Sequence, residues 1–333
     1  MIKSFYLFIY GFIALPVMLH AQPEVDTIKT SEAARIINIL ASDSLKGRGN
    51  LQPGLLKAAN FIGDEFSKIG LTPLAGFQDY FIPFQVLDGK KISKDSSFRK
   101  NNSRPVNPMI GYNIVGVLPG KSKPNEIIII SAHYDHEGVF ALKQGDSILN
   151  GANDNASGTT ALLLLAKYFT ARNDNERTLL FCAFSGEEMG LKGSHDFISY
   201  TNPKNIAACI NLEMIGIPQF GAKTVFITGD GISSLHNLLS KKLKENGLTI
   251  TPEPDPTNPE QKLFRRSDNY PFALEGIPAH TIMASDDDDD CYHQPCDEIK
   301  RIDIENMTAI TRAIAASLRT LINGEETPKS FYK

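Results

Sequence analysis

Two amphipathic segments lie in the first quarter of the chain. Residues 29–43 and 55–70 carry apolar side chains at the three- and four-residue spacing that predicts helices. A short stretch rich in glycine and proline separates them and predicts a turn. The polar, basic stretch that follows, at 84–108, predicts an exposed loop.

Beyond this loop, short apolar and β-branched runs alternate with helix-like segments. The runs predict buried strands at 113–118, 127–132, 178–184, 206–212, 224–228 and 279–284. The helix-like segments are 157–171, 232–246 and 302–322. Strands that alternate with helices indicate a parallel sheet with both faces buried. We therefore expect an α/β fold, a three-layer sandwich whose mostly parallel central sheet is covered by helices on both faces.

The first 21 residues differ in composition from the rest. Lys3 precedes an apolar stretch from about Phe5 to Leu19, and the segment closes on Ala21. This layout is typical of a secretory signal peptide, and the apolar stretch is shorter than the ~20 residues of a membrane-spanning helix. We expect cleavage after Ala21, a periplasmic or secreted protein, and no stable membrane insertion afterwards; a membrane anchor is the alternative.

Composition excludes several classes of protein. The chain has 333 residues, 42% of them hydrophobic and 22% charged, which is ordinary for a globular protein and excludes a disordered or fibrous one. Its 34 basic and 38 acidic residues form no basic block, so we expect no nucleic-acid partner. Four cysteines are too few for a disulfide scaffold. Cys182 and Cys209 lie in apolar strands as buried thiols, whereas Cys291 and Cys296 are close enough to pair or to stay free.

Five predicted strand ends, or the loops that follow them, carry His, Asp or Glu. In chain order these motifs are AHYDH at 132–136, GANDNASG at 151–158, FSGEE at 184–188, NLEMIG at 211–216 and YHQPCDE at 292–298. Because ligands bind at the carboxyl ends of parallel strands, five such motifs together indicate a metal site. Two divalent cations about 3.5–4 Å apart need a bridging carboxylate and further His or carboxylate ligands. That ligand set suits zinc, and cobalt or manganese would also fit.

In this order the five motifs resemble the zinc-dependent aminopeptidase family that includes bacterial leucyl aminopeptidases, and glutaminyl cyclases share that fold. The resemblance covers roughly residues 110–322. It implies two zinc ions per chain, bridged by one aspartate, with ligands from all five motifs: His133, Asp154, Glu188, Glu213 and His293. In this arrangement Asp154 is the bridge, His133 and Glu213 complete one ion's ligands, and Glu188 and His293 hold the other.

The resemblance also assigns two residues that do not hold metal. Glu187 is implied to be the general base, and Asp135 to orient the imidazole of His133, as carboxylates near metal-bound histidines commonly do. One position departs from the family, which usually has Asp where this chain has Glu213. Glutamate is one methylene longer but still offers an oxygen ligand.

These features predict an exported zinc aminopeptidase that acts on peptides with a free amino terminus. The chain then divides into the signal peptide 1–21, an amino-terminal helical segment and exposed loop at 22–109 that packs on the catalytic domain, and the di-zinc catalytic domain 110–333. The oligomeric state and the preferred amino-terminal residue stay open. We interpret His136 as part of the loop structure, and the run Asp286–Asp290 as a solvated loop rather than a calcium site.

Three alternatives remain on the same scaffold. The first is glutaminyl cyclisation; however, the chain has no Trp, and Tyr292 stands where the cyclases have one. The second is carboxypeptidase or dipeptidase activity, which needs a basic group to hold a free carboxylate, as Arg265 or Arg266 could. The third is a binding module without catalysis, against which the intact ligand set argues.

Overall fold

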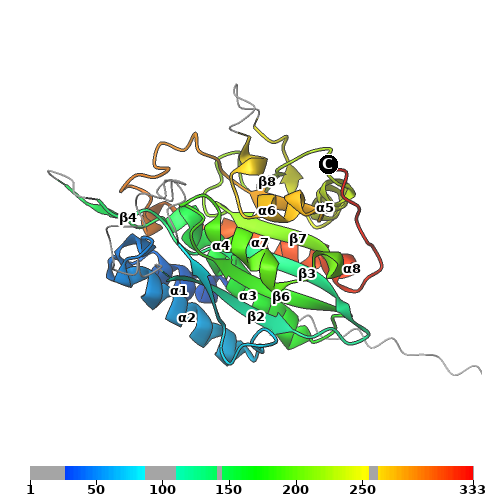
Figure 1. The fold of residues 1–333 in the computed structure, drawn as a ribbon. Coiled ribbons are helices and arrows are strands. Elements are labelled where there is room, and N and C mark those ends of the chain that lie inside the picture. Colours follow the sequence, from blue (N-terminus) through cyan, green and yellow to red (C-terminus); the bar gives the residue numbers. More distant parts are fainter. Residues whose placement is uncertain (1–26, 87–109, 141–144, 255–261, 333) are drawn as a thin grey trace, which may run out of the picture.

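The computed structural model describes residues 27–86, 110–140, 145–254 and 262–332 (Figure 1). An eight-stranded sheet runs through the molecule in the order β1-β2-β6-β3-β7-β10-β8-β9. Its strands are β1 (Phe81–Gln85), β2 (Ile110–Leu118), β3 (Lys123–His133), β6 (Arg177–Phe184), β7 (Ile206–Glu213), β8 (Thr224–Ile227), β9 (Thr249–Ile250) and β10 (Ala279–Met283). A separate hairpin pairs β4 (Gly138–Val139) with β5 (Ile148–Leu149).

The sheet is mostly parallel. Strands β6, β3, β7 and β10 form its parallel centre, whereas β1, β2 and β8 pair antiparallel toward the two edges. The central strands are buried almost from end to end, as parallel strands covered on both faces must be. All six predicted strands are present, and the α/β prediction is confirmed.

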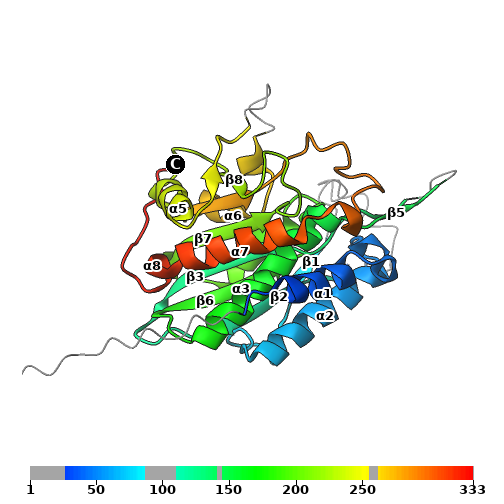
Figure 2. The ribbon, with the colours of Figure 1, turned by 180° about the vertical axis from the view of Figure 1, so that it is seen from behind.

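Helices cover both faces of the sheet (Figures 1 and 2). One face packs against α1 (Thr30–Leu40), α2 (Pro53–Ile69), α3 (Gly158–Arg172), α5 (Ser234–Glu245) and α7 (Ile304–Ser317), with the short α8 (Arg319–Ile322) after α7. The other face packs against α4 (Lys192–Phe197) and α6 (Asn269–Leu274). Side chains that alternate along β3 show the division, because Ile128 and Ile130 join the first core and Ile129 joins the second.

Helix α3 lies at the centre of the first layer. It contacts α1, α2 and α7 as well as β3, β6 and β7, and its buried residues surround the helix axis. A helix that is apolar on all sides is stable only when it is buried on all sides. The amino-terminal helices α1 and α2 therefore cover α3 as well as part of the sheet, which Figure 2 shows.

One sequence prediction needs correction. The expected loop at 84–108 begins too early, because Phe84 and Gln85 belong to β1 and pair with Gly111 and Ile110 of β2. Strand β1 lies at the sheet edge and contains Pro83, which weakens the strand pattern in the sequence and is tolerated only where no partner needs its missing N–H. The rest of that loop and the predicted signal peptide lie outside the described residues.

The carboxyl ends of the central strands lie side by side. His133 ends β3 opposite Phe184, the last residue of β6, and Glu213 ends β7 opposite Met283, the last residue of β10. The loops that follow these strands therefore leave the sheet at one edge. Among the described residues, no helix is both long and apolar enough to cross a membrane.

Candidate metal centre

The five predicted ligands come together at this edge of the sheet. Asp154 lies between two histidines: its Oδ1 is 3.2 Å from His133 Nε2, and its Oδ2 is 3.1 Å from His293 Nε2. Glu188 Oε1 is also 3.2 Å from His293 Nε2. Glu213 groups with His133 and Asp154, so that one ligand atom from each lies within 4.8 Å of the others. Asp154 thus offers one oxygen to each of two ligand groups, as a bridging carboxylate must.

Local hydrogen bonds explain the position of Asp154. The turn at 152–157 precedes α3, and the carboxylate of Asp297 accepts the backbone N–H of Asn153 at 2.9 Å and that of Asp154 at 3.0 Å. The Asn155 side chain donates to the Leu212 carbonyl at 2.9 Å and accepts the Met214 N–H at 3.2 Å. The asparagines of the GANDNASG motif therefore attach the bridging aspartate to the end of β7.

Gly151 is required at the start of this turn. Its φ is +54°, and a Cβ there would lie 2.1 Å from the Asp154 carbonyl oxygen and 2.5 Å from the His136 ring. Any larger residue would be strained in backbone conformation and would push the turn away from the site.

Asp135 supports the turn that carries Glu187 and Glu188. Its carboxylate accepts a hydrogen bond from Asn50 at 2.6 Å and the backbone N–H groups of Glu187 and Glu188, both at 3.4 Å. The nearest acceptor for His133 Nδ1 is the Asp135 carbonyl oxygen at 3.3 Å, and the carboxylate is farther away at 3.8 Å. Asp135 thus contacts His133 mainly through its backbone.

Without cations, two of the buried carboxyl groups in the site are difficult to ionise. Burial raises the pKa of Glu187 well above its ordinary value, and the neighbouring carboxylates of Glu213 and Glu188 raise it further. Burial also raises the pKa of Glu213 to about 7. Burial would lower the pKa of His293, but hydrogen bonds to Asp154 and Glu188 raise it to about 10. Positive charge at the centre of the cluster would relieve all three.

The donor set fits zinc. The Oε2 atom of Glu213 is buried without a hydrogen-bond partner, and His133 Nε2 is likewise buried without a hydrogen bond although it faces Asp154. Such atoms are costly to bury unless something binds them. Imidazole and carboxylate together are the ligands that zinc uses in catalytic sites. A bound cation would provide the missing partner for both atoms.

Three residues near the centre were not predicted from the sequence to take part in it. His136, interpreted there as loop structure, is buried and lies 2.9 Å from Glu188 Oε1 through its Nδ1. Asp297 holds the Asp154 turn, as described above, and Glu137 Oε1 lies 3.7 Å from His293 Nδ1. Their proximity arises from the tertiary fold, so no spacing along the chain reveals it. The YHQPCDE motif did contain Asp297, but nothing in the motif distinguished it from a surface acid.

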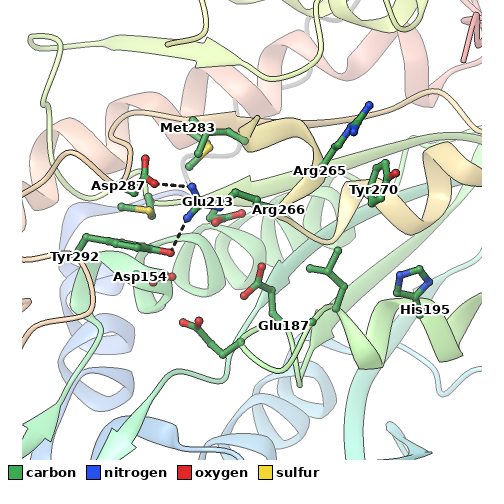
Figure 3. Close-up of a pocket in the computed structure, with 15 residues that line it drawn as sticks. Asp154, Glu187, His195, Glu213, Arg265, Arg266, Tyr270, Met283, Asp287 and Tyr292 are labelled. Atoms are coloured by element: carbon green, nitrogen blue, oxygen red, sulfur yellow. Dashed lines mark hydrogen bonds and ion pairs between the residues drawn. The ribbon is translucent and has the colours of Figure 1, made fainter. Parts of the chain in front are cut away.

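A cavity of about 400 Å³ opens onto the centre (Figure 3). Part of its wall is apolar, from Met214, Leu263 and Met283. Arg266 crosses this part, paired with Asp287 at 2.5 Å and 3.4 Å from the Tyr292 hydroxyl. Arg265 also lines the cavity and forms no ion pair with any residue that the structure describes.

The loop between β10 and α7 is more ordered than predicted. Cys291 and Cys296 form a disulfide on either side of His293, one of the two possibilities left open by the sequence. The acidic run is not simply solvated, because Asp286 is buried against Gln219 and Asp289 pairs with Arg301. Cys182 and Cys209 are buried free thiols, as predicted.

Comparison with protein families shows which family the chain belongs to. The model of peptidase family M28 matches residues 113–318, which include every candidate ligand named above. The chain belongs to peptidase family M28. The resemblance stated from the five motifs is thereby confirmed.

Curated relatives of the chain are distant in sequence. Aminopeptidase YwaD of Bacillus subtilis is 26% identical over 234 residues, which are 66% of this chain and 47% of the relative. Aminopeptidase Y of Saccharomyces cerevisiae is 29% identical over 224 residues, 61% of this chain and 40% of the relative. The chain therefore spans about half the length of the curated relatives it matches.

Solved structures share the fold of this M28 chain. A zinc aminopeptidase from Bacillus subtilis superposes with a TM-score of 0.65 at 16% identity, covering 89% of this chain and 95% of that one. A glutaminyl cyclase from Bacteroides thetaiotaomicron gives a TM-score of 0.64 at 16% identity, covering 90% and 99%. Because peptidases and a cyclase fit almost equally well, the fold alone does not choose between the two reactions.

Proposed function

We propose that this M28 protein is a zinc-dependent aminopeptidase that removes residues from the amino terminus of peptides. The observation that carries the proposal is the pair of ligand groups that share Asp154, with Glu187 beside them at the wall of the cavity. His133, Asp154 and Glu213 would hold one zinc ion, and Asp154, Glu188 and His293 the other. Two such ions supply Lewis-acid chemistry, which polarises a carbonyl and makes water acidic.

Glu187 is the residue proposed to move the proton. It lies next to Glu188, and Figure 3 shows its carboxylate facing the same space as Asp154. Burial raises the pKa of Glu187, and bound zinc ions would lower it again, so its ionised carboxylate could take a proton from the attacking water and later return it to the leaving amine. No serine or cysteine nucleophile is required, and the two free cysteines are buried within strands.

The carboxylate of Glu187 also favours a substrate with a free amino group. Glu187 lines the cavity and is not one of the proposed zinc ligands, so a protonated amine that enters still meets a negative charge at that wall. An acetylated amino terminus carries no charge and gains nothing from that wall. This asymmetry supports exopeptidase action at the amino end of the substrate.

The decisive experiment combines metal analysis with a substrate panel. Protein purified without chelator should contain about two zinc equivalents per chain, hydrolyse unblocked aminoacyl substrates, and leave amino-acetylated ones intact. Absence of zinc in the folded protein, or equal hydrolysis of blocked and unblocked substrates, would overturn the proposal. The same panel should include a glutaminyl peptide, because ammonia release without cleavage of its first bond would identify a cyclase instead.

We propose export on the basis of the disulfide. Structural disulfides persist in oxidising compartments and are rare in the cytosol, and Cys291–Cys296 closes the loop that carries His293. The apolar leader in the sequence agrees with this localisation. Thiol titration of the protein isolated from cells without reductant tests it, with two free thiols per chain expected after unfolding.

Arg265 favours a second candidate, hydrolysis of dipeptides. It is an exposed cation that lines the cavity and has no acidic partner in the described part of the chain, whereas Arg266 is already paired with Asp287. A dipeptide would place its carboxylate one residue from the cleaved bond, within the same cavity. Comparison of dipeptides with their carboxyl-terminal amides tests this, and a preference for the acids that Arg265→Ala abolishes would support it.

A further inference from the structure

His136 has no assigned role, yet its ring lies inside the second ligand group. The side chain is buried, and its Nδ1 is 2.9 Å from Glu188 Oε1 and 3.5 Å from Asp154 Oδ2. The same two oxygens face His293 Nε2, at 3.2 and 3.1 Å. The four residues offer ligand atoms that all lie within 4.8 Å of one another.

These separations are those of atoms around one ion. Zinc ligands lie about 2.0–2.1 Å from the metal in a tetrahedral site, which places neighbouring ligand atoms about 3.3 Å apart. The four measured separations, from 2.9 to 3.5 Å, bracket this value. A histidine that only donated a hydrogen bond to Glu188 would need to face one oxygen, but His136 Nδ1 faces one oxygen from each of two carboxylates.

We propose that His136 is a fourth protein ligand of the second metal ion, beside Asp154, Glu188 and His293. The inference rests on the proposed zinc site and adds a ligand to it. With His136, the second ion has four protein ligands, whereas the first has three: His133, Asp154 and Glu213. Closed four-ligand sites hold zinc most firmly, and a site with three protein ligands keeps a position open for water or substrate.

The surrounding backbone fixes the His136 ring in this place. The backbone N–H of His136 donates to the Arg48 carbonyl at 3.2 Å. The buried Arg48 guanidinium donates to the carbonyls of Tyr134 at 2.8 Å and Gly151 at 2.9 Å. Gly151 leaves space for the imidazole, because a Cβ there would lie 2.5 Å from the ring. The ring also meets His293 edge to face, with centroids 5.3 Å apart.

The experiment measures metal binding rather than activity. Full-length wild-type protein, His136→Ala and His136→Asn are stripped with chelator and titrated with Zn²⁺ against a chromophoric competitor. Asparagine places an amide N–H near the position of Nδ1, so it can replace a hydrogen bond but not a zinc ligand. His236→Ala on α5, which belongs to none of the ligand groups, is the matched control, and circular dichroism checks that each variant folds.

We expect two zinc sites of unequal affinity in the wild type. Both His136 variants should weaken the tighter site by about 100-fold or more, since loss of even an indirect partner of a zinc ligand costs about 10–100-fold. The control should bind as the wild type does. With Co²⁺ in place of Zn²⁺, the visible absorption of the tighter site should change in both variants.

Other outcomes separate this inference from the proposed function. Wild-type affinity in His136→Asn with weak binding in His136→Ala would show that the residue only donates a hydrogen bond, and the inference would be wrong. Unchanged binding in both variants would also overturn it, while leaving the zinc aminopeptidase proposal intact. A wild-type protein that binds no zinc would instead refute the proposed function itself.

Discussion

At the scale of single residues, the proposed centre divides metal binding and proton transfer between two adjacent glutamates. Glu188 Oε1 lies against His293 and His136. Glu187 groups with His133 and Glu188, and not with His293 or His136. Adjacent side chains on a turn diverge, and Asp135 holds this turn through the backbone N–H groups of both glutamates. Two residues of the same type can therefore perform different chemistry.

The substitution Glu187→Gln tests that separation. The amide keeps the size of the side chain but cannot accept a proton, so turnover should fall by about 10²–10⁴-fold. Zinc content should stay at the wild-type value, because Glu187 lies outside the ligand set that holds the ions. Steady-state rates and metal analysis of the same preparation measure both. Near-wild-type turnover would mean that another group is the base, and Glu188→Gln is the comparison that should lose metal as well as rate.

Asp297 provides a test of a residue that acts only through its neighbour. Its carboxylate accepts the N–H groups of Asn153 and Asp154, and an amide in its place would turn an N–H toward them. We expect Asp297→Asn to lower zinc affinity by about 10–100-fold, as loss of such supporting bonds usually does. The exposed Glu305→Gln on α7 is the control. Unchanged zinc titration in Asp297→Asn would show that the turn holds Asp154 without it.

The clustering of the candidate ligands could be predicted from sequence, because most of them lie at or after strand ends and strand ends meet in a parallel sheet, whereas Asp154 lies in the turn before α3. His133, Glu188 and Glu213 follow this rule directly. His136 and Asp297 could not be predicted in the same way, since their contacts join residues 52 and more than 140 positions apart. Only the folded chain brings such pairs together.

At the scale of elements, long apolar runs were predicted well and short elements were missed. Strands β3, β6 and β7 are continuous runs that must be buried, and α1, α2, α5 and α7 keep a helical period over three turns or more. Helices α4 and α6 have six residues each, too few for a period to be visible. The antiparallel direction of β8 was not predictable either, because the residues of a strand are the same for both directions.

Strand β10 carries a buried histidine whose protonation couples to folding. His280 Nδ1 lies 2.6 Å from the Thr228 carbonyl and its Nε2 2.6 Å from Ser233 Oγ, at the start of α5. A carbonyl only accepts, so Nδ1 donates and the neutral ring accepts from the serine. Burial lowers the pKa of His280 from 6.5 to about 4. The folded state therefore binds fewer protons than the unfolded state between these two pH values.

Because the unfolded state binds more protons in this range, the stability that His280 contributes is full above pH 6.5 and is lost as the pH falls toward 4. The full effect is on the order of 3 kcal/mol. We expect His280→Asn to be less stable than the wild type at pH 8 and to show a shallower loss between pH 6.5 and 4. Urea unfolding across this range measures it. The exposed Lys204→Gln is the control, because lysine does not titrate in this range, and equal slopes for wild type and His280→Asn would contradict the expectation.

At the scale of the whole molecule, one core joins the amino-terminal helices to the sheet. The cluster includes Ile36 and Ile62 from α1 and α2, Ile130 from β3, and Ile310 from α7. The sequence predicted these helices, but not that β1, between α2 and β2 in the chain, would extend the sheet itself. Strand pairing depends on partners far away in the chain, and the alternating burial of β1 is only five residues long.

The acidic centre links metal binding to the stability of this whole fold. Asp135, Asp154 and Asp268 are buried, as is Glu213, so the metal-free protein must hold several carboxyl groups away from water. Zinc that binds only the folded state stabilises it by mass action, by about 4 kcal/mol at 1,000 times the dissociation constant. We therefore expect removal of zinc by chelator to lower the melting temperature by several degrees and re-addition to restore it. Glu188→Gln should reduce this shift, and the exposed Glu245→Gln on α5 should leave it unchanged. A wild-type melting temperature that does not change when zinc is removed would contradict the proposed metal centre.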